Sequence, residues 1–248
     1  MKANLRDTTI IIPIFIDSTE RLENLIYVVE YIQVYFHTHI IIIESGDQPT
    51  KEILEMEDVQ YVFHKKTEDF FHRTKLLNSG IRLSRTRFVC LYDADVFFEP
   101  RAYAEAQKMC SEGYSMVYPY GGKFVDVGRD VLRNGDIAEF ASFATNSVGG
   151  AVFINRGDYW DAGLENENIV GWGPEDNERL ARMIKLGYKT CRVEGTCWHI
   201  VHPRGTNDGP KNPYTERNNE EYEGVKEMSK EMLKEYIETW PWAKQLTR

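Results

Sequence analysis

The sequence predicts an α/β fold in which helices flank a mostly parallel central sheet. Three short runs rich in β-branched residues, 8–16, 39–45 and 59–63, are separated by stretches with helical spacing of apolar residues, 19–36 and 51–56. The first two runs are almost continuously apolar, as is typical of strands buried on both faces of a parallel sheet. Strands that alternate with helices in this way favour an open sheet covered by helices.

Four residues in this first part of the chain have local consequences. Pro13 interrupts the run 8–16, so a ladder of hydrogen bonds should end or bulge there. Asp17 and Ser18 are suited to cap the helix that follows. Gly80 falls inside a helix predicted for residues 70–84, where it costs about 1 kcal/mol relative to alanine and raises the question of close packing.

The remaining elements are predicted from the same kinds of pattern. Strands are expected at 88–91, 115–120, 151–155 and 190–193, and helices at 101–112 and 175–186, the last ending at Gly187. Residues 124–140 carry few signals and are interpreted as a helical or irregular insertion. The organisation expected is one catalytic domain over residues 1–215, with a donor half to about 100, and an amphipathic helical extension over 216–248.

Composition excludes some classes of protein. The 248 residues are 42% hydrophobic and 28% charged, which is ordinary for a soluble globular protein, and the net charge of −9 argues against a nucleic-acid binder. Four cysteines without a CxxC pair indicate free thiols in a reducing compartment. No stretch approaches the ~20 apolar residues of a spanning helix. We therefore expect a cytoplasmic protein, at most peripheral to a membrane through Trp240 and Trp242.

Carboxylates stand where three of the predicted strands end. Asp93 and Asp95 follow the strand at 88–91, and their i, i+2 spacing lets both side chains converge on one point. Such a pair suits Mg²⁺ or Mn²⁺, which can itself hold phosphates, although an acidic, solvated turn is the plainer interpretation. Asp17 and Glu44 end two further strands. Ligands of open α/β sheets bind at this edge.

Polar residues of the helix at 70–84 and a glycine pair are weaker candidates. Arg73, Lys75 and Asn78 form either a solvated helix face or a set of groups that hold a nucleotide. Gly149 and Gly150, before the strand at 151–155, either let the backbone pass close to a ligand or make a simple turn.

A second constellation begins with Gly171-Trp172-Gly173-Pro174 and continues into Glu175 and Asp176. Proline and acidic residues at a helix start also serve helix capping and the helix dipole. Alternatively, one carboxylate acts as general base toward a hydroxyl group, and a sugar ring lies on the face of Trp172.

Two histidines, His199 and His202, follow the strand at 190–193. A single histidine is more often structural than functional. Beside two aspartates, however, neutral imidazoles would complete a Mn²⁺ site with mixed oxygen and nitrogen ligands.

The order of these motifs over residues 8–215 resembles glycosyltransferases of the GT-A fold. The likeness is to family 2-like enzymes with a galactosyltransferase-type C-terminal motif, similar to β-1,4-galactosyltransferases and polypeptide N-acetylgalactosaminyltransferases. Asp93-Ala94-Asp95 resembles the DxD motif, residues 171–176 resemble GWGxED, and His202 matches the late metal-ligating histidine better than His199 does. The resemblance implies metal binding by Asp93, Asp95 and His202.

The resemblance also implies roles for the other candidates. Asp176 would be the catalytic base, and Glu175 would position the sugars together with Trp172. Gly173 and Gly150 would also lie at the substrate. Asp17, Glu44, Arg73, Lys75, Asn78 and Asp93 would contact the nucleotide. One departure is that Asn177 and Glu178 follow Asp176, where the galactosyltransferase motif continues with further acidic residues. The sugar preference is therefore open.

The activity expected is transfer of galactose or N-acetylgalactosamine from a UDP-sugar to a saccharide or lipid-linked saccharide. The transfer would need Mn²⁺ or Mg²⁺ and invert the anomeric carbon, in polysaccharide or glycoconjugate synthesis. Alternatives are a retaining transferase, a catalytically silent sugar-binding protein and a nucleotidyltransferase. The last would show a glycine- and Arg/Lys-rich loop near the N-terminus, whereas residues 12–21 contain one arginine and no glycine.

Overall fold

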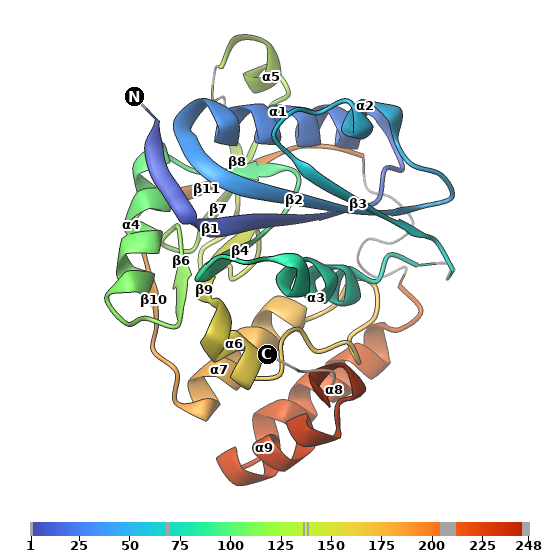
Figure 1. Cartoon of the computed structure of the whole chain (residues 1–248), viewed down its shortest axis with the longest axis vertical. Helices are drawn as coiled ribbons and strands as arrows, with labels where there is room; N and C mark the ends of the chain where they lie inside the picture. Colours follow the sequence, from blue (N-terminus) through green and yellow to red (C-terminus); the bar gives the residue numbers. More distant parts are fainter. Residues whose placement is uncertain (1, 68–69, 136, 138, 204–211, 245–248) are drawn as a thin grey trace.

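In the computed structural model, residues 2–67, 70–135, 137, 139–203 and 212–244 are described, and a seven-stranded sheet runs through their centre (Figure 1). Its strand order is β10-β6-β9-β4-β1-β2-β3. These strands are β1 (Ala3–Ile14), β2 (Phe36–Gly46), β3 (Gln60–Lys65), β4 (Phe88–Tyr92), β6 (Met116–Tyr118), β9 (Ala151–Asn155) and β10 (Thr190–Arg192). The α/β fold expected from the sequence is confirmed.

The sheet is mixed rather than wholly parallel. β1, β2, β3 and β4 run parallel, as do β6 and β10, but β9 is antiparallel to both β4 and β6. Pro13 affects one neighbour of β1 and not the other. The pairing with β4 stops at Ile11, while that with β2 continues through Pro13 to Ile14. Proline has no N–H to donate to a neighbouring strand. Pro13 does not interrupt the pairing with β4, because that pairing has already ended at Ile11.

Helices cover both faces of the sheet. α1 (Thr19–Tyr35) and α2 (Lys51–Leu54) lie on one side of β1–β3, and α3 (Arg73–Leu83) lies on the other (Figure 1). Ser18, and not Asp17, caps α1, because its side chain accepts a hydrogen bond from the Arg21 amide at 3.2 Å. The other helices before residue 200 are α4 (Pro100–Ser111), α5 (Val131–Asn134), α6 (Arg156–Asp161) and α7 (Glu175–Leu186).

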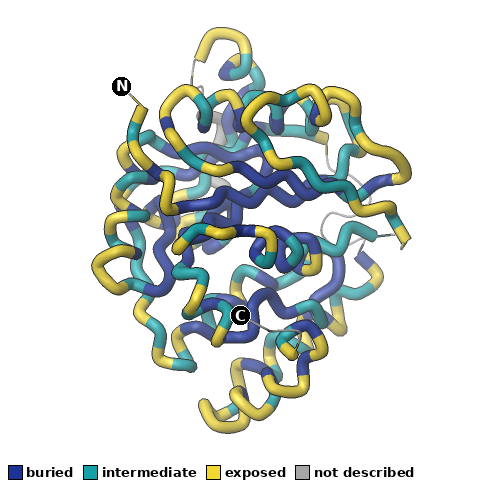
Figure 2. Tube along the Cα trace, in the orientation of Figure 1, coloured by how far each residue is buried: buried dark blue, intermediate teal, exposed yellow. Residues whose placement is uncertain are grey.

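Gly80 brings α3 unusually close to the sheet. A Cβ atom placed on it would lie 2.4 Å from Cγ2 of Ile11, in the middle of β1. Close packing therefore accounts for a glycine inside this helix. The apolar side chains of β1, β2 and β4 are buried, and Figure 2 shows these strands as the buried centre of the molecule.

A second, four-stranded sheet lies beside the first, in the order β5-β11-β7-β8. Its strands are β5 (Val96–Phe97), β11 (Thr196–Ile200), β7 (Lys123–Val127) and β8 (Glu139–Ala144). The prediction of a helical or irregular insertion at 124–140 is wrong for β7 and for the start of β8, which are strands, and is correct for α5 and the short turn before it. β7 is stabilised by β11, about 70 residues further along the chain, and no local pattern reveals such a partner.

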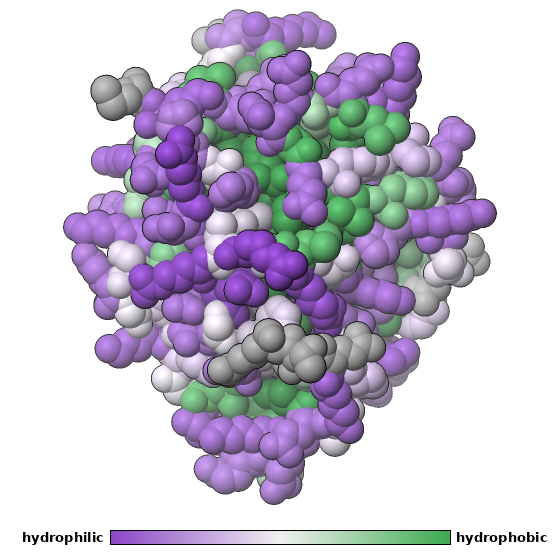
Figure 3. Space-filling model, viewed as in Figure 1, coloured by the Kyte–Doolittle hydropathy of each residue, from purple (hydrophilic) through white to green (hydrophobic). Residues whose placement is uncertain are grey.

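The C-terminal segment contains more than the one helix predicted: α8 (Thr215–Glu227), α9 (Lys230–Thr239) and the short α10 (Pro241–Lys244), with 245–248 outside the described residues. Trp240 and Trp242 are buried against Val225, Leu233 and Ile237. The C-terminal segment therefore packs on the domain as expected, and these two side chains are not exposed for the membrane contact considered for them. In Figure 3 the lower end of the molecule, where α9 lies, is mostly hydrophilic, with a small hydrophobic patch above it. Among the described residues, no helix combines the length and apolar character needed to cross a membrane.

Candidate active site

A cleft of about 920 Å³ opens at the carboxyl ends of β1 and β4. It continues between the second sheet and the loop that precedes α7. Among the residues lining it are these predicted ones: Asp17, Arg73, Asp93, Asp95, Trp172, Gly173, Glu175, Asp176 and His202. Motifs that lie far apart in the sequence thus share one cavity at the edge where α/β sheets bind ligands.

Asp95, His199 and His202 form a cluster in which the candidate ligand atoms all lie within 4.8 Å of one another. His202 Nε2 lies 3.0 Å from Oδ2 of Asp95, and His199 Nε2 lies 3.9 Å from the same oxygen. The second sheet builds this cluster. Asp95 immediately precedes β5, whose Val96 pairs with His199 of β11, and the Asp95 carbonyl accepts from the Ile200 amide at 2.8 Å.

The charges in the cluster support one another. Burial alone would raise the pKa of Asp95, but the hydrogen bond from His202 and the charges of the two histidines and Arg21 lower it to about 2. For His202, burial lowers the pKa and the bond to Asp95 raises it, with a net increase. One carboxylate and two imidazoles are a donor set that fits Mn²⁺ better than Mg²⁺, which prefers oxygen ligands alone.

Asp93, also predicted as a metal ligand, takes no part in this cluster. Its Oδ1 accepts a charged hydrogen bond of 2.6 Å from Nη2 of Arg73, the first residue of α3. Burial still raises the pKa of Asp93, in spite of the arginine. The structure therefore groups Asp95 and His202 as expected, adds His199, and places Asp93 on an arginine.

Arg73 also contacts the two carboxylates at the start of α7. Its Nη1 lies 3.5 Å from Oε1 of Glu175 and 3.5 Å from Oδ1 of Asp176, both in the first turn of α7. Burial lowers the pKa of Arg73, but the negative charges of Asp93, Asp176 and Glu175 raise it further, with a net increase. One cation thereby connects the acidic end of β4 with the start of α7.

Asp176 and Glu175 differ in charge because their partners differ. Asp176 Oδ1 accepts from Nη1 of Arg179 at 2.7 Å, and the two arginines lower its pKa against the effect of burial. Oδ2 lies against Gly149, where a Cβ atom would be only 3.1 Å away. Glu175 is 6% exposed, and its buried Oε2 has no hydrogen-bond partner. Burial and the charge of Asp176 raise the pKa of Glu175 to about 8.

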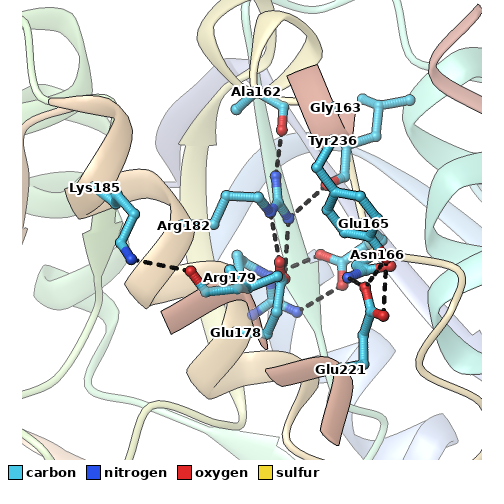
Figure 4. A network of polar contacts seen from close by, with 12 residues as sticks. Ala162, Gly163, Glu165, Asn166, Glu178, Arg179, Arg182, Lys185, Glu221 and Tyr236 are labelled. Atoms are coloured by element: carbon cyan, nitrogen blue, oxygen red, sulfur yellow. Dashed lines mark hydrogen bonds and ion pairs between the residues drawn. The ribbon is translucent and has the colours of Figure 1, made fainter. Parts of the chain in front are cut away.

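A buried polar network holds α7 in place behind the cleft (Figure 4). Glu165 binds Arg179 through contacts of 2.7 and 3.1 Å, and Glu178 binds Arg182 through contacts of 2.8 and 3.2 Å. Arg182 also donates to the carbonyls of Ala162 and Leu164, at 2.5 and 2.7 Å. Both arginines are almost fully buried. The first pair directly supports Asp176.

Trp172 is half exposed at the mouth of the cleft, on a loop held by side-chain amides. The Trp172 carbonyl accepts from Nδ2 of Asn212 at 2.5 Å and from Nδ2 of Asn218 at 3.2 Å. Gly173 lets Asn218 approach, since a Cβ atom there would lie 2.7 Å from its Nδ2. The ring is therefore free to meet a ligand while its backbone is fixed.

Four predicted residues do not line the cleft. Glu44 is buried and accepts from Thr50 and Tyr61, and Asn78 is buried and bonds to the backbone of Glu165. Lys75 is on the exposed side of α3. Gly150 has φ +83°, and its carbonyl accepts from the Asp93 amide. Polar residues at strand ends and on helices suit structural and ligand roles equally, so their type alone could not separate the two.

Arg21 and Asp126 are cleft residues that the sequence reasoning missed. Arg21 Nη1 lies 3.8 Å from Oδ2 of Asp95, and its Nε pairs with Asp17 at 3.0 Å. The i, i+4 spacing of Asp17 and Arg21 was a readable signal for this ion pair. Asp126 bonds to His199 at 2.7 Å. It lies in β7, which was not predicted as a strand.

Residues 131–204 match the family model described as the N-terminal domain of galactosyltransferase. The match supports a transferase. No curated protein matches the chain. The predicted resemblance to GT-A glycosyltransferases is confirmed by this match and by the similarity of the fold to solved structures.

Three solved structures illustrate the shared fold. The catalytic domain of Drosophila β1,4-galactosyltransferase 7 in complex with xylobiose has a TM-score of 0.51 at 16% identity, covering 81% of this chain and 72% of that one. A mutant of that enzyme with manganese, UDP-Gal and xylobiose has the same score and identity, covering 79% and 71%. GalNAc-T7 with UDP, GalNAc and Mn²⁺ has a TM-score of 0.60 at 15% identity, covering 95% of this chain and 52% of that one.

Proposed function

We propose that the protein transfers galactose or N-acetylgalactosamine from a UDP-sugar to a saccharide hydroxyl in a metal-dependent reaction. The observation that carries the proposal is a single cleft with Asp95, His199 and His202 in one part and Asp176 beside the exposed ring of Trp172 in another. The structures of similar fold that were obtained with manganese, UDP-Gal and xylobiose, or with UDP, GalNAc and Mn²⁺, support the same choice of ligands.

Asp95, His199 and His202 would hold the metal, and Mn²⁺ is the ion that their mixed donors favour. When bound, a divalent cation neutralises the negative charge of a departing diphosphate and orients it. Arg21, which lies beside Asp95, adds a fixed positive charge in the same part of the cleft. It would bind the diphosphate from the side of α1.

Asp176 would be the general base. Arg179 and Arg73 keep it ionised at neutral pH, and because both contact Oδ1, Oδ2 is the oxygen left to accept a proton. It would take the proton of the acceptor hydroxyl as that oxygen bonds to the anomeric carbon. The bond from this carbon to the diphosphate oxygen breaks on the opposite face, and the transfer inverts the configuration.

Glu175 and Trp172 would position the sugars. Glu175, with a pKa raised by burial to about 8, is protonated at pH 7 and would donate a hydrogen bond to a sugar hydroxyl. The exposed face of Trp172 would carry the C–H groups of a pyranose ring. Together these side chains would hold the acceptor oxygen near Asp176.

Calorimetric titration with UDP, UDP-Gal, UDP-GalNAc and UDP-GlcNAc, each with and without Mn²⁺, tests the donor site. Mn²⁺-dependent binding of one of them, lost in Asp95→Ala and His202→Ala, is the expected result. His37→Ala, at an exposed histidine outside the cleft, is the control and should bind as the wild type does. If no uridine nucleotide binds under either condition, the donor assignment is wrong.

Two further experiments separate the remaining alternatives. Anomeric NMR of the first-formed product distinguishes inversion from retention. A protein that binds the donor but neither transfers nor hydrolyses it would be a catalytically silent binding protein. A role in polysaccharide or glycoconjugate synthesis, with a saccharide or lipid-linked saccharide as acceptor, is part of this proposal. So is a cytoplasmic location, which the four free thiols of the described structure support.

A further inference from the structure

One wall of the metal cluster is made by a strand that carries none of its ligands. β7 pairs in parallel with β11, and in this register Asp126 is the direct partner of His199. Two residues earlier, on the same face of β7, the ring of Phe124 lies 5.5 Å from the imidazole of His199, centroid to centroid. The imidazole is therefore in contact with two side chains of β7.

The contact with Asp126 determines which nitrogen of His199 is available. Oδ1 of Asp126 lies 2.7 Å from Nδ1 of His199. An ionised carboxylate only accepts hydrogen bonds, so Nδ1 carries the proton and Nε2 keeps its lone pair in the neutral ring. Nε2 is the atom that points toward Asp95, at 3.9 Å.

His202 shows the same arrangement with a different partner. Its Nδ1 lies 2.8 Å from the Pro203 carbonyl, which is also only an acceptor, and its Nε2 lies 3.0 Å from Asp95. Both imidazoles are thus fixed through Nδ1 with Nε2 toward the same oxygen. A carboxylate is the stronger of the two partners, because it makes a charge-assisted bond to the histidine.

We propose that Asp126 is a positioning residue for the metal site, acting through His199. It holds the ring in the tautomer and orientation in which Nε2 binds the cation, and its negative charge makes that nitrogen a better donor. The inference rests on the proposed metal-dependent function and adds to it a residue that neither the metal-ligand motif nor the catalytic motif contains. β7 would then be part of the active site and not only a scaffold for it.

The test is the affinity for Mn²⁺ alone, measured from the electron paramagnetic resonance signal of the free ion. Outer-shell partners of metal ligands typically change affinity by about 10–100-fold. We expect a loss of that order in Asp126→Ala and a smaller one in Asp126→Asn, whose amide oxygen can still accept from Nδ1. Asp130→Asn is the matched control, since it removes the same charge from an exposed position four residues on and should bind Mn²⁺ as the wild type does.

A double-mutant cycle with His199→Ala shows whether Asp126 acts through the histidine. In the His199→Ala background, Asp126→Ala should change Mn²⁺ affinity by less than about twofold, because the ring that it positions is gone. An equal loss in both backgrounds would mean that Asp126 acts as a ligand or a general charge, and would overturn the proposal. If Asp126→Ala melts at the wild-type temperature and binds Mn²⁺ with unchanged affinity, the proposal is also overturned. The proposed function would remain intact in that case, because the wild type still binds Mn²⁺. A wild-type protein that binds no Mn²⁺ would overturn both.

Discussion

Replacing Arg179 by methionine should impair both the stability and the pH dependence of the protein, whereas the same change at Arg182 should affect stability alone. Each arginine is almost fully buried and paired with a buried glutamate, Glu165 or Glu178 (Figure 4). Only Arg179 also donates to Asp176, at 2.7 Å, whereas Arg182 donates instead to the carbonyls of Ala162 and Leu164. The two variants therefore form a matched pair.

The loss of stability follows from the buried charge left behind. Removing one partner of a buried ion pair typically destabilises a protein by about 3–5 kcal/mol. With an unfolding entropy of about 2.1 cal/mol/K per residue, a chain of 248 residues loses about 6–10 °C of melting temperature. We expect this in both Arg179→Met and Arg182→Met, measured by circular dichroism or calorimetry without ligands.

The pH dependence should separate them. Arg179 lowers the pKa of Asp176, so without it that pKa rises, and the acidic limb of kcat/KM should move to higher pH in Arg179→Met only. Activities are compared well below each melting temperature. If the acidic limb is the same in both variants, Asp176 is not the base that this limb reports. If Arg179→Met melts as the wild type does, the pair with Glu165 is not the support described here.

Three other changes give independent checks. Asp176→Asn should lower kcat about 10²–10⁴-fold with little effect on UDP binding, as expected for a lost general base, and near-full activity would contradict that role. Glu175→Gln should stay active at pH 7, because the pKa of Glu175 is raised by burial to about 8; the wild type should lose kcat/KM above that pH while the variant does not, and an inactive variant at pH 7 would show that the ionised form is needed. Glu175 has a higher pKa in the folded protein than in the unfolded chain, so its contribution to stability is present at acidic pH and is lost as the pH rises to about 8. Denaturant titrations at several pH values should therefore show that the free energy of unfolding falls more steeply with pH in the wild type than in Glu175→Gln. Gly80→Ala should destabilise the protein by up to about 2 kcal/mol, because overpacking costs about 1–3 kcal/mol and outweighs the ~1 kcal/mol gained in helix propensity. The new Cβ would lie 2.4 Å from Cγ2 of Ile11, and a more stable variant would contradict this close approach.

The parts of the fold that were predicted correctly are those with local signals. The strand at β4, the helix α7 and its end at Gly187, where φ is +93°, follow from apolar runs, helix formers and a left-handed glycine. The second sheet was missed because its pairing is non-local: β5 is only two residues long, and β11 pairs with β5 and β7, both of which lie about 70 or more residues earlier in the chain. Propensity is a weak guide for such strands.

The site residues that were predicted correctly also stand in local sequence motifs, and those predicted wrongly depend on tertiary packing. Asp95, Asp176 and Trp172 stand in short motifs with a recognisable spacing, and the structure places all three in the cleft. Lys75 and Asn78 also stand in a recognisable segment, but the orientation of α3 turns one to solvent and the other into the core. Which face of a helix meets a cavity depends on tertiary packing, so residue type could not decide between them.

The pairing of β5 with β11 has a consequence for when the proposed metal site can form. It joins residues 96–97 to residues 198–199, so Asp95 gains its two histidine neighbours only after more than a hundred further residues have been synthesised and folded. A partly folded chain would hold the acidic end of β4 but not the cluster, and would bind Mn²⁺ weakly. An ion that binds only the native state stabilises it by RT ln(1 + [ion]/Kd). A higher manganese concentration would therefore also hold the two sheets together more firmly.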